Sequence, residues 1–194
     1  MGIRKTAKNT HHDDNERFGL RQRLKAEPHH HWLLTRLSSE YYEQRQYALA
    51  LKYAEKAFTE APSCPLVLWD YAGALQMLGR HYEALDLYAR IVTRGVKRIA
   101  TGECGEGRAR ARGLVSDSHY RASLSLKAIG NEQASLSAFD QCLDLRGPGC
   151  RSIYRLAELS TADVPGTRPN KALQPSSHDR KKVRGRRRSR AARG

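Results

Sequence analysis

The stretch at residues 68–91, LWDYAGALQMLGRHYEALDLYARI, carries the pattern that decides the fold of this chain. Gly79 is suited to the left-handed conformation that ends a helix, so a first helix is expected to end there. A second helix is expected to begin near Tyr82. The small side chain of Ala84 lets the two helices approach closely, because helices pack about 8–10 Å apart only where the contact residues permit it.

The same pattern begins 34 residues earlier in the chain. The earlier copy consists of Leu34, Ser38, Tyr41, Tyr47, Ala50, Leu51 and Ala57, which correspond to Leu68, Ala72, Leu75, His81, Ala84, Leu85 and Ile91. Pro62 and Pro65 lie between the two copies and are expected to stop one helix and start the next, because proline cannot donate a hydrogen bond inside a helix.

A third copy follows with an offset of 51 residues, which is one period of 34 plus 17 additional residues. It consists of Gly130, Leu136, Phe139 and Cys142, which correspond to Gly79, Leu85, Tyr88 and Ile91. The additional residues lie within 93–113. We expect a loop at residues 102–107, followed by a long helix to about Ile129. The small residues Ala50, Ala84 and Ser135 are expected at the helix–helix contacts.

These residues resemble the tetratricopeptide repeat, whose period is 34 residues. The matching positions are Tyr41, Tyr47, Ala50, Ala57, Pro62, Gly79, Ala84 and Tyr88. The third unit is degenerate, with Ser135 at the small position and Glu132 where an aromatic residue is usual. The run CPLVLWDYAG at residues 64–73, with the glycine-rich insert at 102–107, also resembles a group of short bacterial tetratricopeptide-repeat proteins without an assigned activity.

The resemblance implies an all-α solenoid of about three helix–turn–helix units. The units are expected at residues 31–64, 65–94 and 106–147, within a domain at 31–163. A short capping element is expected at 150–159, because the ends of a solenoid must be covered.

The net charge of +15 is concentrated at the two ends of the chain. Residues 1–30 hold 7 Lys+Arg and 4 Asp+Glu, and residues 164–194 hold 11 and 1, whereas residues 31–163 hold 17 and 15. Both ends are poor in aliphatic residues and cannot bury enough apolar surface to offset the entropy of ordering. We therefore expect residues 1–30 and 164–194 to be disordered.

The sequence favours a non-catalytic protein. It contains no nucleophile–base pair, no paired-carboxylate site and no metal-ligand set at useful spacing, so we expect no cofactor and no metal. The histidines at 11–12 and 29–31 have no accompanying ligands at zinc-site spacing, and Cys104 is expected to be an ordinary loop thiol. No apolar run is long enough to span a membrane. Without a signal peptide or a CxxC pair, free thiols in the cytoplasm are expected.

Tetratricopeptide arrays bind extended peptides on the concave face formed by the first helix of each unit, and the resemblance implies such a groove here. Aromatic, Met and Arg residues are the types that anchor interfaces. The residues expected to contact a partner peptide or helix are Arg36, Tyr42, Trp69, Asp70, Gln76, Met77, Tyr120, Arg121 and Lys127. The sequence therefore predicts an adaptor whose partner is another protein.

A nucleic-acid-associated protein is the alternative. Eight positive side chains lie within residues 180–190, at Arg180, Lys181, Lys182, Arg184, Arg186, Arg187, Arg188 and Arg190. No aromatic residues are interleaved for base stacking, so any binding would consist of weak, non-specific phosphate contacts. A solvated extension explains the same run equally well.

Overall fold

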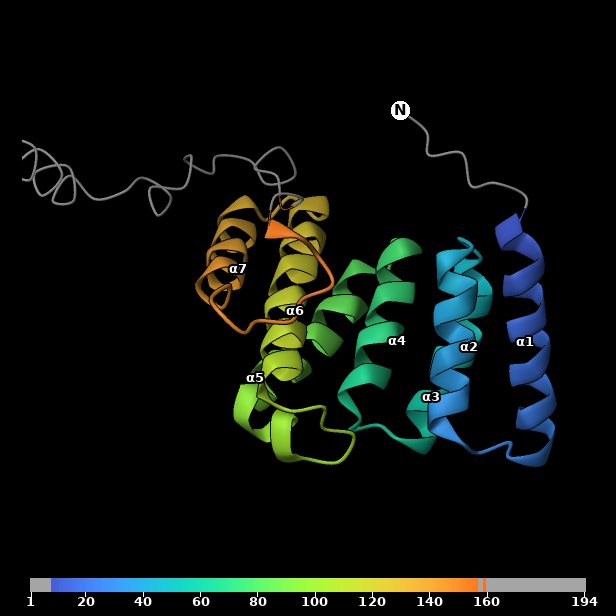
Figure 1. Cartoon of the computed structure of the whole chain (residues 1–194). Coiled ribbons are helices and arrows are strands. Elements are labelled where there is room, and N and C mark those ends of the chain that lie inside the picture. Colours follow the sequence, from blue (N-terminus) through green and yellow to red (C-terminus); the bar gives the residue numbers. More distant parts are fainter. Residues whose placement is uncertain (1–7, 157–158, 160–194) are drawn as a thin grey trace, which may run out of the picture.

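The computed structural model describes residues 8–156 and 159, with side chains from residue 16 onward. Seven helices follow one another in this part of the chain, and it contains no strand (Figure 1). They are α1 (Lys8–Ala26), α2 (His31–Glu43), α3 (Tyr47–Glu60), α4 (Pro65–Met77), α5 (His81–Thr101), α6 (Arg108–Ala128) and α7 (Glu132–Asp144). The prediction of an all-helical repeat fold is confirmed. The predicted basic tail lies outside the described residues.

Each repeat unit is a pair of antiparallel helices, α2 with α3, α4 with α5 and α6 with α7, and the pairs stack along the chain (Figure 1). The three small residues predicted at the contacts, Ala50, Ala84 and Ser135, are all fully buried. Two units also have a serine hydrogen bond across the contact, donated by the first helix in one unit and by the second helix in the other. Ser38 Oγ donates to the carbonyl of Ala50 at 2.9 Å, and Ser135 Oγ donates to the carbonyl of Ser123 at 2.8 Å.

The turn inside each unit repeats in atomic detail. The backbone N–H groups of Gln46, Arg80 and Asn131 each donate to the carbonyl five residues earlier, at 2.9–3.0 Å. The residue before each donor is left-handed, and it is glycine in two of the three units, with φ of 77° at Gly79 and 80° at Gly130. Arg45 takes the same conformation in the first unit with φ of 62°. This is the hydrogen-bonded helix end that a left-handed residue makes possible.

The additional residues between the second and third units extend α5 as well as forming the loop. Gly95, with φ of 71°, kinks α5, which then continues to Thr101. We expected the second unit to end at residue 94, so the extension beyond Gly95 is a correction. Its physical reason is burial, because Ile99 and Ala100 pack into the same hydrophobic cluster as Ala111 of α6.

The described part of the N-terminal segment contradicts the expectation of disorder, because α1 (Lys8–Ala26) packs against α2. Leu20 is buried in a cluster with Leu33 and Leu37. Arg21 donates a hydrogen bond to the Tyr41 hydroxyl and lies over the ring of that tyrosine. The average composition of this segment did not indicate a docked helix, because its packing depends on one buried leucine and the polar residues beside it. Phe18 of the same helix remains exposed.

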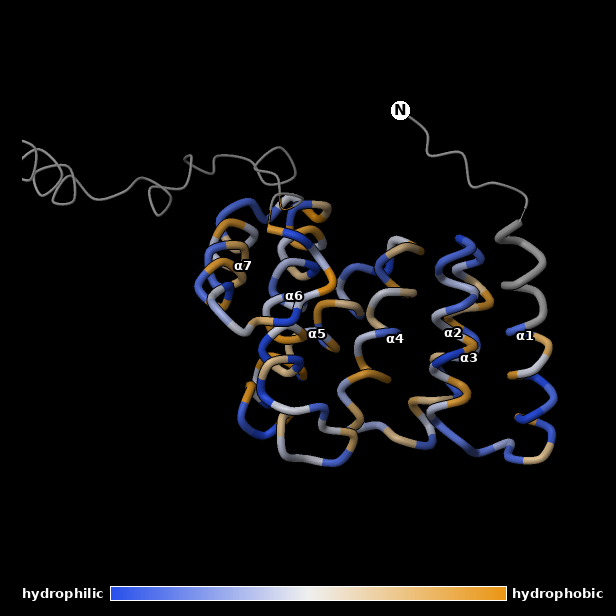
Figure 2. The backbone as a smooth tube through the Cα atoms, viewed as in Figure 1, coloured by the Kyte–Doolittle hydropathy of each residue, from blue (hydrophilic) through white to orange (hydrophobic). Residues whose placement is uncertain are grey.

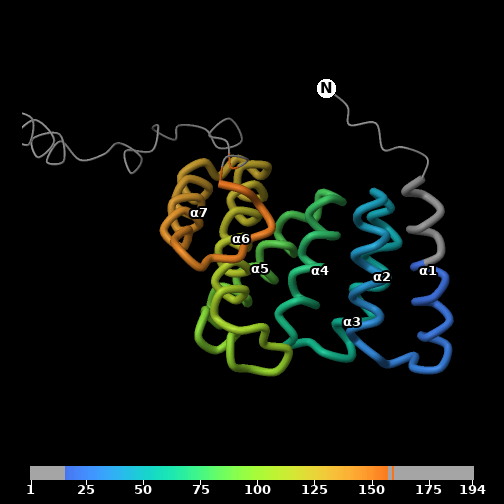
Figure 3. The backbone as a smooth tube through the Cα atoms, viewed as in Figure 1, coloured from blue at the N-terminus to red at the C-terminus, as the bar shows by residue number. Residues whose placement is uncertain are grey.

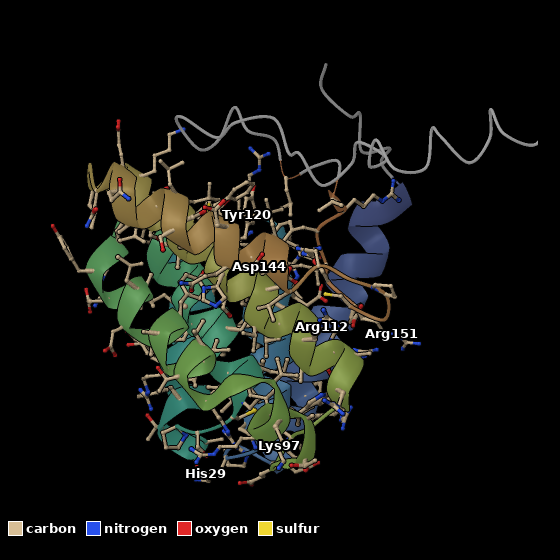
Figure 4. All side chains as sticks on the ribbon, turned by 90° about the vertical axis from the view of Figure 1, so that its left-hand side faces the viewer. His29, Lys97, Arg112, Tyr120, Asp144 and Arg151 are labelled. Atoms are coloured by element: carbon tan, nitrogen blue, oxygen red, sulfur yellow. The ribbon has the colours of Figure 1, made fainter. Side chains whose placement is uncertain are left out.

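The region of the predicted capping element forms an irregular strap. We use "strap" for residues 146–156, which turn back from α7 across α6 (Figure 3). The backbone N–H of Arg151 donates to the carbonyl of Ala109 at 3.0 Å. Figure 4 shows Arg151 beside Arg112 of α6. Beyond the strap, Leu159 is buried against Tyr120 and Phe139, so the strap covers the last unit.

A buried carboxylate anchors the strap to α6. Asp117 accepts hydrogen bonds from the hydroxyl of Ser152 and, at 3.0 Å, from the N–H of Ile153. Arg146 pairs with the same carboxylate at 2.7 Å. Asp117 is only 2% exposed, so removal of Asp117 or of Arg146 would leave the charge of the other buried and uncompensated.

Two helical glycines allow a direct test of the strap contact. A Cβ at Gly113 of α6 would lie 1.8 Å from the carbonyl oxygen of Arg151, whereas a Cβ at Gly73 of α4 would meet nothing closer than 3.6 Å. We expect Gly113→Ala to lower the free energy of unfolding by about 1–3 kcal/mol through this clash. Gly73→Ala should be neutral or stabilising by about 0.5–1 kcal/mol, because alanine favours a helix. Urea denaturation of both variants measures the difference, and equal stability would contradict the described contact.

Candidate functional site

The candidate site is a cavity of about 340 Å³ on the face formed by the first helices of the units. Its walls come from α2, α4, α6 and the strap, so all three repeat units contribute. The lining residues are Arg36, Ser39, Tyr42, Glu43, Trp69, Asp70, Gly73, Arg121, Ile153 and Tyr154. Five of these were among the residues predicted from the sequence, namely Arg36, Tyr42, Trp69, Asp70 and Arg121.

Two of the predicted contact residues are buried inside the fold. Gln76 is 8% exposed, and its side-chain N–H donates to the carbonyl of Arg121 and to the hydroxyl of Ser125, both at 2.8 Å. Tyr120 is 6% exposed and packs against Phe139 and Tyr154. Both residues lie on the first helices, as predicted, but on the side that packs against neighbouring helices.

Met77 and Lys127 also lie away from the lining of the cavity. Met77 is the last residue of α4 and is exposed, and Lys127 is half-buried near the end of α6. Their place at the far ends of the helices separates them from the cavity, whose lining on those helices is centred on Gly73 and Arg121.

The strap contributes two lining residues that sequence reasoning missed, Ile153 and Tyr154. Ile153 is 69% exposed, which is unusual for a large aliphatic side chain beside a cavity. The predicted cap contained both residues, but nothing in their spacing indicated that they would return to the first-helix face. Asp117 decides this, because its carboxylate holds the strap there.

Arg121 is the structural centre of the cavity wall. Its guanidinium donates to three tyrosine hydroxyls, those of Tyr42 at 2.6 Å, Tyr88 at 3.3 Å and Tyr154 at 3.3 Å. These tyrosines come from α2, α5 and the strap. Burial raises the pKa of Tyr88 and of Tyr154, so both remain neutral phenols that accept these hydrogen bonds. Arg121 therefore ties the units together at the cavity.

Asp70 is the main titratable group in the cavity. Its carboxylate accepts a hydrogen bond from Ser39 Oγ at 2.6 Å, which links α4 to α2. Burial raises the pKa of Asp70 from 3.8 to about 7, Ser39 and Arg36 oppose this increase, and Glu43 adds to it. The charge of the cavity therefore changes near neutral pH.

A second cluster of functional side chains lies at the other end of α2. His31, Cys64 and Cys104 bring an imidazole nitrogen and two sulfurs within 4.8 Å of one another. Cys104 Sγ lies 3.4 Å from His31 Nε2, although the two residues are 73 positions apart in the chain. This separation explains why the sequence indicated no metal-ligand set and no histidine near Cys104.

At Cys104 the electrostatics favour the neutral thiol. Burial and the neighbouring Cys64 raise the pKa of Cys104 to about 11. The thiol is therefore protonated at neutral pH in the metal-free protein, which is the opposite of what an activated cysteine nucleophile requires.

Comparison with solved structures finds six chains that resemble this one, and they include a distant likeness. A solved structure described as "Crystal structure of MamA" has a TM-score of 0.40 and 15% identity, over 75% of this chain and 95% of that chain. No protein-family model matches the chain, and no curated protein matches it in sequence.

The hydropathy of the helices shows whether any of them is suited to cross a membrane. Hydrophobic and hydrophilic positions are mixed along the helices (Figure 2). None of the described helices is both long and apolar enough to cross a membrane.

The raised pKa of Asp70 predicts a pH-dependent stability. Between about pH 4 and pH 7 the unfolded chain releases the proton of Asp70 while the folded chain retains it, so the free energy of unfolding falls as pH rises. Asp70→Asn removes this effect. We expect the free energy of unfolding of the variant, relative to that of the parent, to increase by about 2–4 kcal/mol from pH 4 to pH 8.

Chemical denaturation at the two pH values measures this change. Asp86→Asn, which replaces an exposed carboxylate on α5, is the matched control. The prediction is wrong if the free energies of unfolding of Asp70→Asn and the parent differ by the same amount at both pH values. That result would show that the Asp70 carboxyl is ionised in the folded protein at both.

Proposed function

We propose that the protein is a non-catalytic adaptor of the tetratricopeptide type, which binds a peptide or helix of another protein at the Arg121 cavity. The observation that carries the proposal is that one cavity is lined by all three repeat units and by the strap. A surface built from separate units in this way contacts a partner along the array rather than at one point.

The chemistry of the cavity supports a peptide partner. One wall is aromatic and aliphatic, with Tyr42, Trp69 and Ile153, while Glu43 and Asp70 supply acceptors beside it. Peptide side chains combine an apolar body with a polar tip or backbone amide, which fits such a mixed lining. Trp69 packs edge-on against Tyr88, with ring centroids 5.8 Å apart, and therefore offers a rigid contact surface.

The alternative, a nucleic-acid-associated protein, depends on the positive charges at residues 180–190, outside the described part of the chain. It stays a prediction of the sequence. Residues 31–163, which contain the Arg121 cavity, hold 17 Lys+Arg and 15 Asp+Glu, so the two functions depend on different segments and are not mutually exclusive.

The adaptor proposal is tested with a displayed library of random peptides selected on the full-length protein. The affinity of the enriched peptides is then measured for the parent, Ile153→Asp and Tyr82→Asp. Ile153 is 69% exposed and lines the cavity, whereas Tyr82 is 75% exposed on α5 and does not. The first substitution should weaken binding about tenfold or more, as at an interface hot spot, and the second should leave it unchanged.

Circular dichroism checks that both variants keep the helical content of the parent. Enriched peptides that bind Ile153→Asp as tightly as the parent would place the binding surface elsewhere. A library from which no peptide is enriched on the parent protein would count against the adaptor function itself.

A further inference from the structure

The three connections that precede the first helices of the units meet at one end of the molecule. The connection between α1 and α2, that between α3 and α4, and that between α5 and α6 all lie at the bottom of the view in Figure 1. Each supplies one member of the cluster. His31 is the first residue of α2, Cys64 caps the start of α4, and Cys104 lies in the loop before α6.

We propose that His31, Cys64 and Cys104 form a binding site for a zinc ion, which fastens the three repeat units to one another at this end. The two sulfurs and the imidazole nitrogen are the ligand types that zinc prefers in proteins. The site does not overlap the Arg121 cavity, whose α2 residues extend from Arg36 to Glu43.

The distances fit tetrahedral coordination. With Zn–S bonds of about 2.3 Å and a Zn–N bond of about 2.0 Å, a sulfur and a nitrogen on the same ion lie about 3.5 Å apart, and two sulfurs about 3.8 Å apart. Cys104 Sγ and His31 Nε2 are 3.4 Å apart, and all three ligand atoms lie within 4.8 Å of one another. The side chains therefore need little movement to surround an ion.

The backbone holds the ligands in this arrangement. Cys104 has a left-handed φ of 59°, a conformation that a non-glycine residue adopts at a cost, and this conformation is part of the turn that carries its thiol. Cys64 is the N-cap residue of α4, so its side chain is held at the start of that helix.

The site is shielded from solvent on one side and accessible to it on the other. Cys64 is 5% exposed and belongs to a hydrophobic cluster with Leu34, Ala57 and Val67. His31 and Cys104 are half-buried, so an ion can enter from solvent on their side. Three protein ligands leave one position of a tetrahedral ion open for water.

Binding requires no oxidant or other reactant. Each thiol loses its proton to solvent as its sulfur bonds to the ion, so two protons are released for each zinc ion bound. Mg²⁺ prefers oxygen ligands and should not occupy the site.

The test uses the full-length protein kept reduced with a phosphine. Zn²⁺ is titrated in competition with a chromophoric chelator, and Co²⁺ is titrated separately as a spectroscopic probe. We expect one ion per chain and a thiolate-to-cobalt charge-transfer band. At roughly a hundredfold excess of free Zn²⁺ over Kd, the unfolding midpoint should rise by roughly 5–10 °C. Mg²⁺ should leave it unchanged.

Matched variants assign the ligands. Cys104→Ser and His31→Ala should each weaken Zn²⁺ binding at least tenfold, and at the same free Zn²⁺ concentration the thermal shift should fall by about half or more. Cys150→Ser replaces a half-buried thiol of the strap that is not part of the cluster, and His29→Ala replaces an exposed imidazole that contacts Glu60 at 2.7 Å. Both controls should bind Zn²⁺ like the parent. Circular dichroism confirms the helical content of each variant.

Three results would overturn the proposal. The first is a parent protein without a cobalt–thiolate band. The second is undiminished Zn²⁺ binding by Cys104→Ser with loss in His29→Ala, which would assign the ion to the histidine tract. The third is a parent that binds no Zn²⁺ when reduced but forms a Cys64–Cys104 disulfide on mild oxidation, which would make the pair a redox bridge.

Discussion

The fold depends on the close approach of the two helices inside each unit, where Ala50, Ala84 and Ser135 leave no room for a larger side chain. Two serines at these contacts donate to the backbone of the partner helix, Ser38 to Ala50 and Ser135 to Ser123. Close pairing in turn sets the angle at which each unit presents its first helix. The first helices α2, α4 and α6 therefore form a common face, and every functional feature of the described chain depends on that face or on its ends.

Two charged groups convert this face into a shaped cavity. Asp117 holds the strap against α6 through Arg146, Ser152 and the backbone of Ile153. Arg121 then joins the strap to α2 and α5 through three tyrosine hydroxyls. Both groups form several hydrogen bonds within the fold, so their main contribution is to the shape of the cavity. The residues left available to a partner are the ones around them, notably Trp69, Asp70 and Ile153.

The same solenoid geometry produces the histidine–cysteine cluster. Stacked units bring equivalent connections to one end of the array, so residues that begin successive units become neighbours in space. His31, Cys64 and Cys104 each occupy such a connection, and the additional residues before α6 are what allow Cys104 to reach the other two. The additional residues before α6 interrupt the sequence repeat, but in the structure they bring Cys104 to His31 and Cys64.

The sequence by itself determined the three helical hairpins, the small residues between their helices and the glycine turns, because these follow from local spacing and backbone preference. The resemblance to the tetratricopeptide repeat also predicted that Arg36, Tyr42 and Trp69 lie on one face. Only the tertiary structure decided the docking of α1, the return of the strap and the meeting of Cys104 with His31. Those features depend on contacts between residues far apart in the chain, such as Leu20 with Leu37 and Asp117 with Ser152. No local pattern records such contacts, because their energy comes from burial and charge pairing that exist only after the units have stacked.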